Sequence, residues 1–275
     1  METEQIIQSL SYVTWVLLGS LALGSFALTW VLRQTTDATS GFLGFSAILA
    51  AVFGLGWLAV EWGLPDPTEL AIEGSTALDE PRRAAIALFT VLALVAGVRL
   101  RRDGRALWLG GLAILAGVAA MFLGAVAWSD AEPIGVSIFI QLLSLSAVTG
   151  GSMAAVVLAH WYLVTPKISE RPLIVTTQLL MVALVMQLLL FGVWAAAGIP
   201  DMEPFEALTG DNMIFVCLRL IVGVVFPLVL TAMAYRTALT RSKESATGLL
   251  YIEFALVMAS TIVAAGLLFG EGLLV

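Results

Sequence analysis

The chain has 275 residues, of which 60% are hydrophobic and only 12% carry a charge, and its formal net charge is −7. A soluble protein of this composition would leave large apolar surfaces in water, so the composition excludes a soluble globular class and indicates an integral membrane protein. A single cysteine excludes an internal disulfide, and a single histidine argues against a haem held by two histidines.

Eight continuous apolar segments are each long enough to cross a hydrocarbon core about 30 Å thick, which takes roughly 20 residues of helix. Their apolar residues do not alternate with polar ones, as they would in barrel strands, so we expect an all-α polytopic fold. A short surface helix is also expected at residues 68–73, in the longest connection. The eight expected spans are residues 11–33, 41–62, 84–100, 106–128, 134–164, 173–197, 213–238 and 247–269.

The second four spans repeat features of the first four. Gly19 precedes Trp30 by eleven residues in the first span, and Gly150 precedes Trp161 by eleven in the fifth. The second and sixth spans end in the matching tetrapeptides Gly-Leu-Pro-Asp and Gly-Ile-Pro-Asp at residues 63–66 and 198–201. This pattern predicts two tandem four-helix halves, residues 1–130 and 131–275. Because each half has an even number of spans, the repeat would be parallel.

Charge predicts the orientation in the membrane. The connections after the odd-numbered spans carry ten basic and four acidic residues, whereas the opposite face carries two basic and 14 acidic ones. The positive-inside rule therefore predicts a cytoplasmic-membrane protein with both termini outside. The acidic outer face can attract a basic periplasmic partner such as a small cytochrome. The positive-inside bias itself, or a salty or acidic habitat, explains this acidity equally well.

His160 and Glu253 are the first two candidates for chemistry, because ionisable groups inside a membrane mark functional sites by default. Spacing places both near the cytoplasmic ends of the fifth and eighth spans. If these spans are neighbours, imidazole and carboxyl form a pair that relays protons or binds a quinone carbonyl. The alternatives are an interfacial histidine beside Trp161 and a glutamate that extends to the membrane surface.

Arg219 lies six residues into the seventh span and is the third candidate. We expect it to form a structural ion pair with Glu61, at the outer end of the second span, and the alternatives are a pair with Asp211 or an anionic ligand. Other polar and sulfur side chains within the spans are the remaining candidates for ligand binding, although their amides more often join helices. These are Gln141, Thr149, Ser152, Met153 and Gln187.

Two functions stay open from the sequence, besides a structural or assembly role with no site. The first is a membrane subunit of an electron-transfer or quinone-linked complex, with other subunits as partners and no redox centre of its own. The second is a small-solute or proton-coupled transporter, in which Arg219 holds an anion and Glu253 is the coupling carboxylate. Such transporters break helices near the midplane, where the chain has Pro227 and the pair Gly150–Gly151. No motif predicts a metal site, phosphate binding or nucleic-acid binding.

Overall fold

The computed structural model describes residues 3–67, 74–102, 107–129, 132–165, 168–198 and 203–275, and these ranges contain no β-strand. Within them, eight helical segments are long and apolar enough to cross a membrane, as the sequence predicts. The helical elements that form these segments are α1 (Thr3–Thr35), α2 (Ser40–Trp62), α3 (Asp79–Arg101), α4 (Leu107–Ala127), α5 (Glu132–Leu145), η2 (Ser146–Gly150), α6 (Gly151–Val164), α7 (Arg171–Ala197), α8 (Met213–Leu220), η4 (Ile221–Val225), α9 (Phe226–Leu239) and α10 (Lys243–Glu271).

Local sequence signals set several helix ends. The Thr39 hydroxyl accepts a hydrogen bond from the Phe42 backbone N–H at 3.4 Å and so caps the start of α2. Pro172 lies in the first turn of α7, where its missing N–H costs nothing. Gly198 and Gly272 end α7 and α10 with φ of 63° and 69°, a conformation that glycine adopts without strain.

The fifth and seventh spans are not regular helices throughout. The fifth consists of α5, the π-helical turn η2 and α6, and the seventh consists of α8, the π-helical turn η4 and α9. A π-turn holds more residues than an α-turn, so side chains after it point in different directions from those that an unbroken helix would give. The turns lie where the sequence suggested helix breaks: η2 ends at Gly150, and η4 ends two residues before Pro227.

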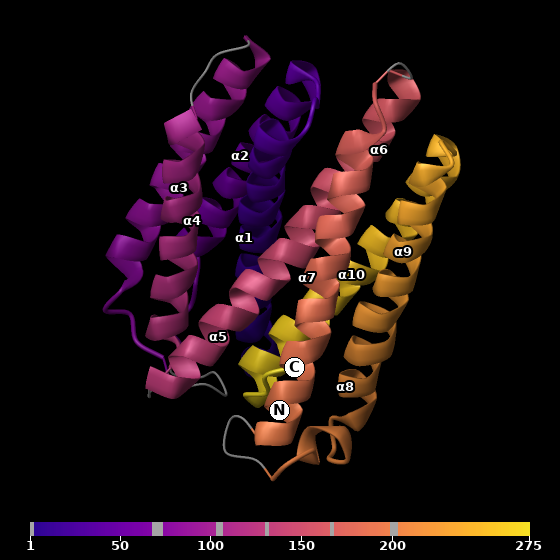
Figure 1. The fold of residues 1–275 in the computed structure, drawn as a ribbon. Helices are drawn as coiled ribbons and strands as arrows, with labels where there is room; N and C mark the ends of the chain where they lie inside the picture. Colours follow the sequence, from indigo (N-terminus) through magenta and orange to yellow (C-terminus); the bar gives the residue numbers. More distant parts are fainter. Residues whose placement is uncertain (1–2, 68–73, 103–106, 130–131, 166–167, 199–202) are drawn as a thin grey trace.

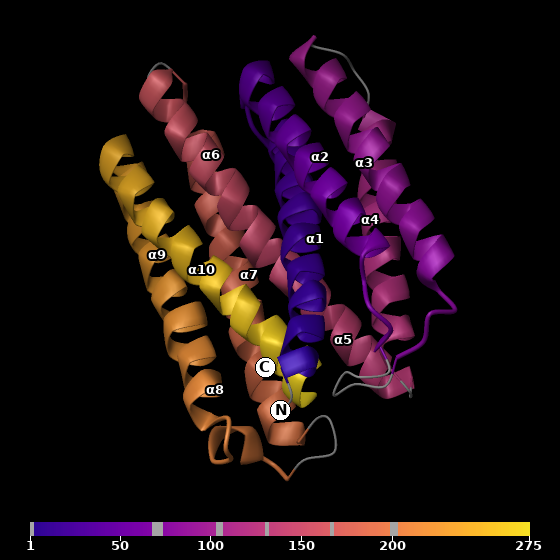
Figure 2. The ribbon, with the colours of Figure 1, turned by 180° about the vertical axis from the view of Figure 1, so that it is seen from behind.

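The first and fifth spans cross at the centre of the molecule and are the two most buried spans (Figures 1 and 2). Gly24 of α1 and Gly150 of η2 face each other at the crossing. A Cβ added at Gly24 would overlap the carbonyl oxygen of Ser146, and one added at Gly150 would overlap the carbonyl oxygen of Ser20. Small residues therefore let the two backbones approach, as is common between membrane helices.

Packing continues outward from this crossing in both directions. In the first four spans α1 packs on α2, α2 on α3, and α3 on α4, and in the second four α6 packs on α7, α7 on α9, and α9 on α10. The expected contact between the fifth and eighth spans is confirmed, since α6 packs on α10. Two further contacts, α1 with α10 and α4 with α5, join the two groups.

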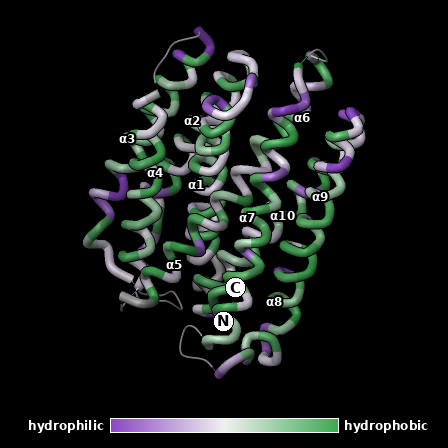
Figure 3. Tube along the Cα trace, in the orientation of Figure 1, coloured by the Kyte–Doolittle hydropathy of each residue, from purple (hydrophilic) through white to green (hydrophobic). Residues whose placement is uncertain are grey.

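Both chain ends lie at the same end of the bundle, with the connections that follow the even-numbered spans (Figure 1). Hydrophobic residues cover most of the helix lengths, and polar residues gather mainly at the two ends (Figure 3). The third span begins at Asp79, five residues earlier than expected, so Arg82 and Arg83 belong to a helix rather than to a loop. The surface helix expected at residues 68–73 lies outside the described residues.

Candidate functional site

Glu253 is the most deeply buried ionisable group of the second half. Its exposed fraction is 0%, and Ser152 of α6 donates a hydrogen bond of 2.6 Å to its Oε1. Its Oε2 is buried and has no hydrogen-bond partner, and no cationic group of the described residues lies within 4 Å of the carboxyl. The side chain therefore has one neutral donor in a place where a carboxylate normally needs several.

Arg219 occupies a second polar position on the same group of helices. It lies on α8 and is 2% exposed, and its Nη1 donates a hydrogen bond to the hydroxyl of Ser260 on α10. Its Nε is buried and has no hydrogen-bond partner. Ser260 follows Glu253 by seven residues, so the two groups lie on one face of α10, about 10 Å apart along the axis.

The two π-turns pack against this face of α10. In η2, the Thr149 hydroxyl lies 2.5 Å from that of Thr261, so the two spans are joined by a buried hydrogen bond. In η4, Gly223 lies against Ser260, and a Cβ added there would overlap the serine hydroxyl. Non-regular backbone thus packs against α10 at Ser260, which binds Arg219, and at Thr261, and π-turns occur frequently at functional sites.

His160 and Glu253 do not form the expected pair. His160 is exposed, and its Nδ1 lies 3.2 Å from the hydroxyl of Tyr251, on the exposed side of α10. Glu253 instead contacts Ser152, which is eight residues, or about 12 Å, from His160 along α6. The expectation fails because α10 begins at Lys243 and not at 247, so the carboxyl lies deeper than predicted.

The remaining candidate side chains are spread over several contacts. Thr149 and Ser152 contact α10, as described above, while Met153 is only half-buried. Gln141 on α5 is buried, and neither its amide nitrogen nor its oxygen has a hydrogen-bond partner. The amide oxygen of Gln187 on α7 is also buried without a partner. The structure therefore gathers Thr149 and Ser152 around the α10 face, and it shows no shared contact among the other three.

The expected ion pair of Arg219 with Glu61 is wrong. Glu61 pairs with Arg82, whose Nε lies 3.0 and 2.9 Å from the two carboxylate oxygens. Trp15 donates to the same carboxylate at 2.6 Å, and Arg82 also donates to Asp79 at 2.8 Å. The physical reason is proximity along the chain: α3 starts at Asp79, so its first turn brings Arg82 to the end of α2.

Sequence reasoning missed this cluster because Arg82 was counted as a loop charge. The signal was present, since a carboxyl ends one apolar segment and two arginines begin the next. The cluster is also packed into aromatic rings: the Arg82 guanidinium lies 5.2 Å from the ring centroid of Trp128, which in turn lies 4.7 Å from that of Trp15. Each charge has partners, which is typical of a structural core.

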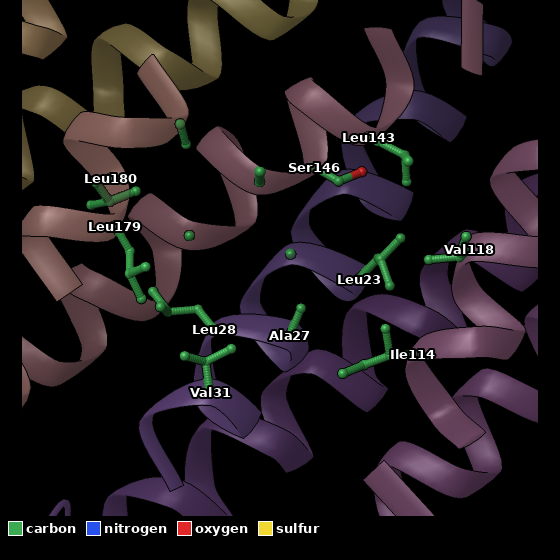
Figure 4. A pocket seen from close by; sticks show the side chains of 14 residues that line it. Leu23, Ala27, Leu28, Val31, Ile114, Val118, Leu143, Ser146, Leu179 and Leu180 are labelled. Atoms are coloured by element: carbon green, nitrogen blue, oxygen red, sulfur yellow. The ribbon is translucent and has the colours of Figure 1, made fainter. Parts of the chain in front are cut away.

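An apolar cavity of about 300 Å³ lies between the two groups of helices (Figure 4). Helices α1, α4, α5, α6 and α7 and the turn η2 contribute its lining, and Leu28, Ile114 and Leu180 are typical of the side chains that face it. Ser146 is the one hydroxyl of the lining, and it already donates to the carbonyl oxygen of Leu142 at 2.7 Å. This cavity can therefore hold an apolar chain but offers few polar contacts.

Among the described residues, no group of three or more histidine, cysteine, aspartate or glutamate side chains could hold a metal ion. Comparison with known proteins adds no assignment: no protein-family model, no curated protein and no solved structure matches the chain. The case for a function therefore comes from the sequence and the geometry of the described residues.

Proposed function

We propose that the protein is a proton-coupled transporter of a small solute and that Glu253 carries the coupled proton. The observation behind this proposal is the contrast between the two buried glutamates of the described residues. Glu61 is surrounded by donors, whereas Glu253 has one neutral donor and one oxygen without a partner. An ionisable group in a membrane is costly, so an incompletely bonded carboxyl at this depth suits a group that binds and releases a proton.

The helix interruptions support the same function. The turn η2 ends two residues before Ser152, and η4 begins two residues after Arg219. Transporters commonly interrupt helices beside their substrate and ion sites, near the middle of the membrane. Arg219, and Ser152 as the hydrogen-bond partner of Glu253, therefore each lie within two residues of backbone that differs from a regular helix.

A quinone-linked membrane subunit is the second candidate, and the apolar cavity favours it. A cavity of about 300 Å³ lined by leucine, isoleucine and valine suits the isoprenoid tail of a quinone. The separation of His160 from Glu253 counts against this function, because the expected head-group site needed both. Purification in mild detergent followed by an absorbance spectrum tests it, and a co-purifying quinone or cytochrome is the supporting result.

The location that fits this function is the cytoplasmic membrane, with both termini on the outer side. Charge supports this orientation, because the end of the bundle opposite the termini carries most of the basic residues. On the same basis, the acidic outer connections are the surface that a basic partner would meet.

We also infer that residues 1–130 and 131–275 are copies of one four-span unit. The helix contacts support this, because each contact has a counterpart in the other half. The first span packs on the eighth as the fifth packs on the fourth. At the central crossing, Ser20 and Gly24 face Ser146 and Gly150, which have the same spacing. These contacts match Gly24 with Gly150, five residues from the Gly19 that the sequence pattern matched with it. Contacts of this kind are expected where two copies meet across an axis along the membrane normal.

The transport proposal is tested by proton uptake into liposomes that contain the purified protein and the pH dye pyranine, with potassium and valinomycin to hold the voltage. Pyruvate, glycine and glucose are added outside as an anionic, a zwitterionic and a neutral solute. We expect at least one solute to drive proton uptake above the rate of empty liposomes. In Glu253→Gln this uptake should fall to the rate of empty liposomes, because the amide cannot exchange the proton.

Glu244→Gln is the matched control, since Glu244 is exposed in the first turn of the same helix. It should retain uptake, and both variants should elute as the wild-type protein does in size-exclusion chromatography. Solute-driven proton uptake that persists in folded Glu253→Gln contradicts the proposal. A wild-type protein that moves no protons with any of the three solutes also contradicts it.

A further inference from the structure

We propose that Arg219 is the binding group of a site for one small, planar, monovalent oxyanion, such as a carboxylate or nitrate. As the cargo of the transporter, this anion rests on the proposed function, but its binding does not. The inference begins from charge. Of the two buried arginines among the described residues, Arg82 has the carboxylates of Glu61 and Asp79, whereas Arg219 has only the neutral hydroxyl of Ser260.

A guanidinium keeps its proton in proteins, so Arg219 cannot escape the cost of burial by becoming neutral. A buried charge without a partner costs several kcal/mol, and a counter-charge offsets that cost. The nearest candidate on the facing helix is Glu253, but this carboxyl is bonded to Ser152 and lies about 10 Å from Ser260 along α10. The counter-charge is therefore best supplied by a ligand.

The geometry of the guanidinium indicates what kind of anion fits. Nη1 is occupied by Ser260, which leaves the edge formed by Nε–H and an Nη2–H. Nε is buried and has no hydrogen-bond partner, and the side-chain hydrogen bond that Arg219 makes to a described residue is the one from Nη1. Two parallel donors on one edge match the two oxygens of a carboxylate or nitrate, which arginine binds in bidentate fashion. One cation balances one negative charge, so the expected anion is monovalent.

The packing around Ser260 holds the guanidinium in this orientation. Gly223 of η4 lies against Ser260, where any larger residue would overlap the hydroxyl. The same π-turn begins two residues after Arg219 along the chain. Arg219 is thus fixed by a neutral contact on one side while its charge and two donors stay available on the other.

The test is equilibrium binding to the purified full chain in detergent, measured by isothermal titration calorimetry. Sodium nitrate and sodium pyruvate are the probes, and sodium sulfate at equal ionic strength is the tetrahedral, divalent control. We expect nitrate and pyruvate to bind and sulfate to bind at least tenfold more weakly. Arg219→Lys should weaken binding about tenfold or more, because it keeps the charge and loses the second donor.

Arg219→Gln should abolish binding and should still fold, since it removes the buried charge. Ser260→Ala is a second variant, which keeps the charge and should weaken binding less than Arg219→Lys does. Binding that is unchanged in folded Arg219→Gln, or the absence of nitrate and pyruvate binding in the wild type, overturns the inference. Binding that depends on Arg219 without proton uptake in liposomes would remove the transport proposal and leave the anion site standing.

Discussion

At the scale of single residues, the molecule treats its buried charges in two ways. Glu61 and Arg82 form a buried ion pair, in which Trp15 and Asp79 take part in further hydrogen bonds, although Nη1 of Arg82 is buried without a partner. Removing one partner of such a pair leaves the other charge buried and uncompensated, which typically costs about 3–5 kcal/mol. This cluster is therefore expected to serve stability, in contrast to Glu253.

Glu61→Gln should lower the free energy of unfolding by about 3 kcal/mol, the lower end of that range, because Asp79 still contacts Arg82. Unfolding in detergent micelles, followed by tryptophan fluorescence, measures the change. Glu80→Gln is the control, since Glu80 is exposed in the same first turn of α3. If Glu61→Gln and Glu80→Gln are equally stable, the cluster does not stabilise the fold as described.

The residues of the candidate site could be predicted from the sequence better than their partners could. Polarity within apolar spans was sufficient to single out Glu253, Ser152 and Arg219. The pairing of His160 with Glu253 was wrong because α10 begins four residues earlier than hydropathy predicts, so Glu253 lies deeper than expected. Ser152 and His160 both lie on the regular helix α6, and the eight residues between them turn the two side chains about 80° apart, so the helix face that meets Glu253 does not carry His160.

At the scale of the elements, the closest contact is the crossing of α1 and η2. Gly24 and Gly150 allow the two backbones to touch there, and the hydroxyl oxygens of Ser146 and Ser20 lie 3.5 Å apart. A methyl group at either glycine cannot be accommodated by rotating a flexible side chain, because backbone atoms occupy the space. The crossing therefore depends on the absence of side chains at these two positions.

Gly24→Ala should destabilise the protein by about 2 kcal/mol, within the usual cost of overpacking a core. Gly192→Ala is the matched control, because it lies within a span and a Cβ added there meets nothing within 4 Å. That control should be neutral or slightly stabilising, since alanine favours helix more than glycine does. Thermal unfolding of the two variants in the same detergent measures the difference, and equal midpoints would show that the crossing tolerates a side chain.

Most of the elements themselves could be predicted, because each span is a long apolar run between charged connections. The start of the third span could not, since Arg82 counted as a polar boundary. Its charge is balanced by Glu61 from the preceding helix, a contact between segments that hydropathy along the chain does not reveal. The sequence therefore predicts the wrong boundary where a contact with another helix lowers the free-energy cost of burying a charged residue.

At the scale of the whole molecule, the charge distribution and the matching helix contacts of the two halves both concern how the chain is oriented in the membrane. An even number of spans puts both termini at one end, and the termini lie at the end opposite most of the basic residues. Two halves with the same orientation would bring equivalent surfaces together at the centre, where the first and fifth spans cross. Both halves would therefore have the same orientation across the membrane. Finding which side of the membrane one connection faces determines the orientation of all eight spans.

Cysteine labelling in intact cells measures this sidedness, with the native thiol removed by Cys217→Ser. Ser75→Cys lies in the connection after the second span, and Thr240→Cys lies in the connection after the seventh; both positions are exposed. A membrane-impermeant maleimide should label Ser75→Cys in intact cells and Thr240→Cys only after the membrane is opened, because basic connections remain in the cytoplasm. The reverse pattern would put the termini in the cytoplasm, and it would turn the acidic connections away from any periplasmic partner. The proton transfer proposed for Glu253 would then open to the other side of the membrane, while the contacts of the carboxyl stayed the same.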